Sequence, residues 1–408
     1  MKLNIVFWLK VSLLNLFLVA LLGTFLRLKI CIELPLIQKN LLHSHSHFAF
    51  SGWITHTLLI LMLYVVKNKI QLFSASKYIK LIIANLICAY GMLVSFIYQG
   101  YGAFSIGFST ISIFVFYVFA FSFYKDTRSL KSEIYLRWFK AAFLFGILSS
   151  FGTFFLAYTL TSQNINFDLY LASIYFYLHF QYNGWFLFAC IGLFLSLFKF
   201  NEELLKQSKR YYYLLFFATF ITYVLSILWL NIPDIVYWIT AGLALLQFLG
   251  WIKMQHFLKR CWKNELKDEP RLLRLILLFV AICVSLKFLL QFLLIIPELA
   301  EIVFGIRPIV IAFLHLVLLG IISLFLLYFI FGTHQKLLET GKYIHFALLF
   351  FVVAVFINEL FLFMQGFFGF KKIVLIYINE LLLFAALLLF TSSALLFLFA
   401  LKKRKRIL

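Results

Sequence analysis

Long apolar stretches alternate with short polar connections along the whole chain. Each stretch has about the 20 apolar residues that an α-helix needs to cross a bilayer, so each predicts a membrane span. The expected spans are residues 5–26, 46–66, 79–99, 103–124, 139–160, 171–198, 211–230, 233–252, 272–296, 308–331, 343–365 and 373–400. The pattern therefore predicts an all-α, polytopic membrane bundle of twelve transmembrane helices.

One phrase recurs in this pattern at intervals near one third of the chain. His47–Trp53 and His179–Trp185 both have the sequence His-Phe-x-aromatic-polar-Gly-Trp, and His315–Gly320 keeps the histidine and the glycine. The histidines are 132 and 136 residues apart and fall on the second, sixth and tenth expected spans. We therefore predict a single transmembrane domain of three four-helix pseudo-repeats. The units are residues 1–130, 131–265 and 266–408, with approximate borders.

The distance from each histidine to the next basic residue also repeats. His47 precedes Lys67 by 20 residues, His179 precedes Lys199 by 20, and His315 precedes Lys336 by 21. At about 1.5 Å per helical residue, each separation is roughly 30 Å, the thickness of the hydrocarbon core. The three imidazoles are thus expected at one level, near the membrane face away from the lysines.

Charge sets the expected orientation. The mean hydropathy is +1.03 and only 12% of the residues are charged, which excludes a soluble globular protein. The loops that follow the even-numbered spans, counted with their flanking residues and the C-terminal tail, hold 26 lysines and arginines. The loops that follow the odd-numbered spans hold 6. By the positive-inside rule both termini are cytoplasmic, and we expect the protein in the bacterial cytoplasmic (inner) membrane. Because topology explains the net charge of +21, nucleic acid is not expected as a partner.

The repeated histidines are the first candidates for chemistry. Neutral imidazole binds haem iron, copper or zinc, so His47, His179 and His315 are predicted to face an interior cofactor. The glycines of the phrases remove a side chain where a porphyrin or a neighbouring helix must come close. These glycines are Gly52, Gly184 and Gly320.

Two further histidines precede the second span. His43 and His47 are four residues apart and share a helical face, whereas His45 points about 160° away from His47. The spacing of His43 and His47 suits one metal ion, and the alternative is a looped His43–His45 stretch that serves as an external metal or proton site. His179 is predicted to complete a second metal site or a pocket that faces a gas or a quinone.

Charged residues inside spans are costly and mark function by default. Lys287 lies near the middle of the ninth expected span, and Glu359 and Glu380 lie in the last two. They are predicted to form either a buried Lys–Glu pair that stabilises the third unit or a proton route to a cofactor.

Twelve helices with histidines near the outer ends of helices 2, 6 and 10 resemble the catalytic subunit of haem-copper oxidases and nitric oxide reductases. The resemblance implies that His47, or His45, and His315 clamp a b-type haem, and that His179 is a metal ligand of helix 6. The sequence departs from that family at helix 7, which has no histidine, and at Asn183, where many oxidases have a tyrosine. The chain also resembles the NnrS-type haem- and copper-containing membrane proteins, which have an early His-x-His stretch similar to His43–His45.

Two functions follow as hypotheses. The first is a haem-binding membrane protein for electron transfer or for handling oxygen or nitric oxide, with a suspected haem b, copper or another metal as a further cofactor, and an electron-donor subunit or a quinone as partner. Enzymatic turnover as an oxidoreductase is an open question, since part of the usual ligand set is missing. The alternative is a transporter of a metal ion or small solute that uses the outer histidines with Lys287, Glu359 and Glu380.

Overall fold

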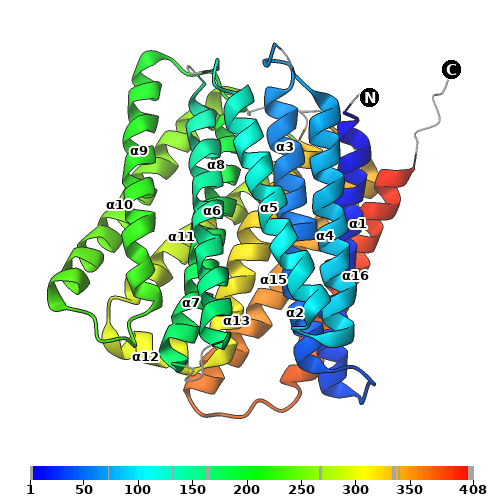
Figure 1. The fold of residues 1–408 in the computed structure, drawn as a ribbon, viewed down its shortest axis with the longest axis vertical. Coiled ribbons are helices and arrows are strands. Elements are labelled where there is room, and N and C mark those ends of the chain that lie inside the picture. The colour runs from blue at the N-terminus through cyan, green and yellow to red at the C-terminus, as the bar shows by residue number, and fades with distance from the viewer. Residues whose placement is uncertain are drawn as a thin grey trace. The chain divides into compact units, whose positions relative to one another are not determined.

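The computed structural model describes residues 3–71, 73–130, 133–161, 166–265, 269–332, 337–338 and 341–402. Within these ranges all regular structure is helical (Figure 1). Eleven helical segments of the described chain are long and apolar enough to cross a membrane. The prediction of an all-α, multi-pass membrane protein is therefore confirmed.

The chain begins with a series of α-helices interrupted by two π-helical segments. These elements are α1 (Ile5–Cys31), α2 (Gln38–Phe48), η1 (Ala49–Thr55), α3 (His56–Val66), α4 (Ala75–Gln99), α5 (Ala103–Asp126), α6 (Ile134–Thr161), α7 (Phe167–His179), η2 (Phe180–Phe186) and α8 (Leu187–Leu195). The second half follows as α9 (Glu202–Ile221), η3 (Thr222–Ser226), α10 (Asp234–Glu265), α11 (Arg271–Leu293), α12 (Pro297–Gly305), α13 (Arg307–His315), η4 (Leu316–Ser323), α14 (Leu324–Phe331), α15 (Lys342–Phe370) and α16 (Ile378–Leu401).

The predicted span at residues 211–230 is not among the eleven. It begins inside α9, whose first half carries charges such as Glu202, Lys206 and Arg210. The α-helix ends at Ile221 and continues as the 3-10 segment η3. The apolar part of this region is therefore too short and too irregular to form an uninterrupted spanning helix. The count of twelve spans stays a prediction.

The chain divides into two compact units. Unit 1 consists of Met1–Thr127, Pro270–Ile276 and Ser323–Leu408, and unit 2 consists of Arg128–Glu269 and Leu277–Ile322. The borders near residues 127 and 269 lie close to those expected for the second repeat, 131–265. The division into three repeats stays a prediction.

Unit 1 brings the two ends of the sequence together. Helix α16 packs against both α1 and α15. The hydroxyl of Thr24 on α1 donates to the carbonyl oxygen of Ala386 on α16 at 3.1 Å. Helix α1 begins and α16 ends at the same end of the unit (Figure 1). Their arrangement agrees with an even number of crossings between them.

Unit 2 is built on α6, which packs against α7, η2 and α8. Helix α9 packs against α10. Asparagine side chains cap two of these helices: the Oδ1 atoms of Asn166 and Asn201 accept from the backbone N–H groups of Leu169 and Leu204. Such caps satisfy N–H groups that have no partner within the helix, so they define where α7 and α9 begin.

Large apolar side chains cover the outward faces of the spans. On α5, for example, Phe104 and Phe121 are each 71% exposed. An exposed apolar surface of this extent would be unfavourable in water but suits contact with lipid chains. The burial pattern thus agrees with the span assignment.

Asn15 joins three elements of unit 1. Its Nδ2 atom donates to the carbonyl oxygen of Gly52 in η1 at 2.6 Å, and its Oδ1 atom accepts from the hydroxyl of Tyr90 on α4 at 2.6 Å. Asn15 is fully buried. Because a buried carbonyl in a membrane has no water to bind, Asn15 is important for satisfying the backbone of the π-helical segment.

We predict that Asn15→Ala lowers the free energy of unfolding by about 1–3 kcal/mol, because it leaves a buried carbonyl and a buried hydroxyl without this partner. Thermal unfolding of the purified protein in detergent measures the effect. Tyr90→Phe removes one of the two hydrogen bonds and should have a smaller effect. Equal stability of Asn15→Ala and the wild type would contradict this role.

Candidate functional site

A π-helical segment directly follows each of the three repeated histidines. Segment η1 begins two residues after His47, η2 begins one residue after His179, and η4 begins one residue after His315. The segments are seven, seven and eight residues long. Since π-helix accounts for well under 1% of residues in proteins and is frequent at functional sites, this coincidence supports the interpretation of the phrases as related units.

Each glycine of the phrases lies inside its π-helical segment, against a protein side chain. A Cβ atom on Gly52 would come within 2.6 Å of the Phe48 ring, and one on Gly320 would lie 3.0 Å from the sulfur of Cys283. At Gly184 an added Cβ would collide with the Cβ of Phe145 on α6. Gly184 and Gly320 thus lie against side chains of neighbouring helices, α6 and α11, whereas Gly52 lies against Phe48, four residues earlier in the chain.

The three histidines of α2 point in two directions, as their spacing predicts. The His47 ring stacks on Phe96 at 4.4 Å between centroids, and its Nε2 lies 3.2 Å from the Tyr101 hydroxyl. His43 contacts the same Tyr101 ring, edge to face at 4.6 Å. On the opposite side, His45 places its Nδ1 atom 3.1 Å from the carbonyl oxygen of Val19 on α1. His43 and His45 therefore do not converge on one point.

His179 is held through both ring nitrogens. Its Nε2–H donates to the carbonyl oxygen of Thr219 on α9 at 2.8 Å, and its Nδ1 accepts from the Nδ2 atom of Asn183 at 3.1 Å. The ring is 1% exposed. In this arrangement neither nitrogen is available as a metal ligand, and His179 links η2 to α9.

His315 has a different arrangement. Its Nδ1 lies 2.9 Å from the carbonyl oxygen of Ile311, one turn earlier. Because a carbonyl only accepts, Nδ1 carries the proton and Nε2 carries the lone pair, the form in which imidazole binds a metal. His45 has the same form, with Val19 as acceptor. Backbone carbonyls are common partners of the second nitrogen in metal-binding histidines.

The predicted pair His47–His315 cannot be assembled from these contacts. His47 belongs to unit 1, and His179 and His315 belong to unit 2. The shared haem between helices 2 and 10 therefore stays a prediction. Among the described residues, no group of three or more His, Cys, Asp or Glu side chains could hold a metal ion.

Lys287 is buried at 1% exposure on α11 and has an amide as its hydrogen-bond partner. Its Nζ donates to Oε1 of Gln291 at 2.7 Å, and Nε2 of Gln291 donates to Oε1 of Gln247 on α10 at 3.0 Å. Gln291 and Gln247 are also buried. The three side chains form a continuous polar chain between two helices of unit 2.

The expected carboxylate partners of Lys287 lie in unit 1. Glu359 accepts from the side-chain amide of Asn358 at 3.2 Å, and Glu380 is exposed in the first turn of α16. The ion pair seen among the described residues joins Lys77 and Asp126 at 2.6 Å. Lys287 thus interacts with glutamines within its own unit, and a Lys–Glu pair stays a prediction.

Two features of this site were not predicted from the sequence. Gln247 is one of several polar residues on α10, and only its pairing with Gln291 shows that it extends the environment of Lys287. The π-helical segments also have no counterpart in the predicted spans, although the recurring phrase marks all three positions. The repeated phrase thus indicated where the π-helical segments lie in the sequence but not that their backbone is π-helical.

Comparison with known proteins adds no assignment, since no protein-family model matches this chain and no curated protein is similar to it in sequence.

We predict that Gly184→Ala destabilises the protein by about 1–3 kcal/mol, because the new methyl group must displace Phe145 or shift α6. Gly107→Ala on α5 is the matched control, since no atom lies within 4 Å of the added Cβ. The control should be neutral or slightly stabilising. Thermal unfolding in detergent compares the two, and similar stabilities would show that α6 does not pack closely against η2.

Proposed function

We propose that the protein is a multi-pass membrane protein that binds haem b through histidines of the repeated phrases and acts in electron transfer or in handling oxygen or nitric oxide. The observation that carries the proposal is that all three repeated histidines adjoin π-helical segments in the described chain. Haem would supply the redox or gas-binding chemistry. The chain would supply the axial nitrogens and an apolar, membrane-embedded environment.

His315 and His45 fit the role of axial ligand best. In both, a backbone carbonyl accepts from the Nδ1–H group, which is a common way to orient a metal-binding histidine. His256 and His345 make the same local bond as His315, to a carbonyl four residues earlier, but neither adjoins a π-helical segment. All three histidines lie within candidate spans, and His315 differs from the other two because it directly precedes the π-helical segment η4.

An optical spectrum of the purified protein, oxidised and reduced with dithionite, tests the proposal. We expect a b-type reduced band that is lost in His315→Ala and lost or shifted in His45→Ala. His345→Ala should keep the band, because it removes the same kind of local hydrogen bond from a histidine outside the repeated phrases.

The same experiment tests whether His179 is a haem ligand. Because both of its nitrogens are bound by the protein, His179→Ala should lower stability and leave the position of the haem band unchanged. A spectrum without haem bands from protein made with ample haem would contradict the proposal.

The polar chain on Lys287 favours a second candidate, a proton-coupled carrier. Burying an ammonium group costs several kcal/mol even when it is paired, and here the partner is an amide. Intramembrane ionisable residues of this kind mark proton or substrate routes. In this candidate function, Lys287 accepts and releases the protons that cross the membrane, and Gln291 and Gln247 orient its ammonium group.

We predict that Lys287→Met abolishes proton flux into proteoliposomes driven by a potassium diffusion potential, while thermal stability is unchanged or higher, since a buried charge is replaced by an apolar side chain. A pH-sensitive dye inside the vesicles reports the flux. Lys253→Met, which removes an exposed lysine of α10, should keep it. Unchanged flux in Lys287→Met, or none in the wild type, rules out this candidate.

A further inference from the structure

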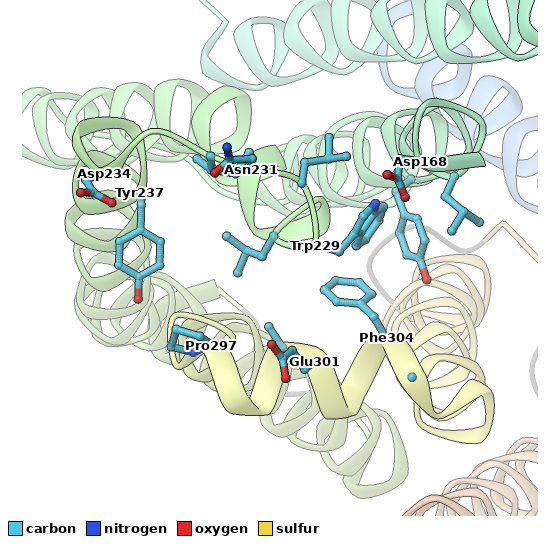
Figure 2. A pocket seen from close by; sticks show the side chains of 15 residues that line it. Asp168, Trp229, Asn231, Asp234, Tyr237, Pro297, Glu301 and Phe304 are labelled. Carbon is cyan, nitrogen blue, oxygen red and sulfur yellow. The ribbon is translucent and has the colours of Figure 1, made fainter. Parts of the chain in front are cut away.

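Unit 2 contains a cleft at one end of its helices. It has a volume of about 760 Å³ and is lined by α7 from Asp168 to Tyr175, the segment from Leu228 to Ile232, the first turn of α10, and α12 (Figure 2). A volume of this size suits an organic molecule and is far larger than a metal ion needs. None of the repeated histidines lines it.

The charge of the cleft is opposite to that of the chain. Asp168, Asp234 and Glu301 line it, and no lysine, arginine or histidine does. The whole sequence has 36 lysines and arginines against 15 acidic residues. Asp168 and Asp234 lie in the first turns of α7 and α10, where a carboxylate also interacts favourably with the helix dipole. Glu301 lies beyond the first turn of α12, so that effect does not explain it. The cleft is thus suited to a cationic ligand.

Aromatic rings form one wall of the cleft. Tyr175, Trp229 and Phe304 contact one another edge to face, with centroid separations of 5.1 Å for Tyr175–Trp229, 4.8 Å for Trp229–Phe304 and 5.4 Å for Tyr175–Phe304. Aromatic faces attract ammonium groups and also pack against methylene chains. This wall therefore suits a ligand with both ammonium and alkyl parts.

The carboxylates are spread along the cleft. Asp234 and Asp168 lie on opposite sides, and Glu301 lies between them on α12 (Figure 2). A divalent cation needs several oxygens converging at about 2.0–2.6 Å, and the described residues contain no such group. Separated carboxylates instead match a ligand whose positive charges are themselves separated.

We propose that this cleft binds an elongated organic cation with two or more ammonium groups, a linear polyamine. The carboxylates pair with the ammonium groups, and the ring wall of Tyr175, Trp229 and Phe304 packs against the methylene segments between them. This inference is independent of haem binding and of the Lys287 chain, since it shares no residue with either site.

Isothermal titration of the full-length protein in nanodiscs with spermidine tests the proposal, with choline and Mg²⁺ as comparison probes. We expect binding of spermidine that weakens with salt, and little binding of choline or Mg²⁺. Glu301→Gln should weaken spermidine binding about two- to fivefold, as for an exposed ion pair. Trp229→Ala should weaken it about tenfold, since it removes the centre of the ring wall.

Two matched controls make the result specific to the cleft. Glu298→Gln removes the same charge from the same short helix, but Glu298 does not line the cleft. Trp238→Ala removes a tryptophan that is 69% exposed on α10, also outside the lining. Both variants should bind spermidine as the wild type does. The proposal is overturned if spermidine does not bind, if choline or Mg²⁺ binds as tightly, or if the controls lose as much affinity as the cleft variants.

Discussion

The need to satisfy every backbone polar group without water shapes the environment of the repeated histidines. In a bilayer each N–H and C=O must find a partner inside the protein. An α-helix does this by itself, whereas a π-helical segment shifts the pairing and creates carbonyls that bind side chains from neighbouring helices. At η1 the carbonyls of Ser51 and Gly52 accept from Asn85 and Asn15. The π-helical geometry is therefore supported by asparagines on α1 and α4.

The same requirement explains the polar partners of His179. Its Nε2–H donates to a backbone carbonyl of α9 near the end of that helix, and Asn183 of η2 binds its other nitrogen. A histidine in such a position stabilises the packing of two helices without any cofactor. The Nδ1–H of His315 instead donates to the carbonyl oxygen of Ile311 in the previous turn of its own helix. Equivalent places in a repeated phrase thus have different local chemistry.

Hydropathy was sufficient to predict the spans because a membrane helix is defined by length and apolarity, both of which are read directly from the sequence. The helical period also placed His43 and His47 on one face and His45 on the other. Hydrogen bonds between side chains of different helices could not be predicted, because nothing in the sequence near Gln247 indicates that it pairs with Gln291. The apolar run at residues 211–230 likewise contains no signal for the change from α-helix to 3-10 helix that follows Ile221.

Unit 2 combines two charge environments that stability alone does not require. The acidic cleft lies at the beginning of α10, at Asp234, and Gln247 lies 13 residues further along the same helix, about 20 Å away. Gln247 leads through Gln291 to Lys287. An apolar residue in place of Lys287 is expected to make a more stable membrane helix, since the buried ammonium loses its hydration and has one amide and the Phe288 ring as partners. Helix α10 thus carries an acidic cleft at its first turn and, further along, contacts a buried cation whose cost the proposed proton route would explain.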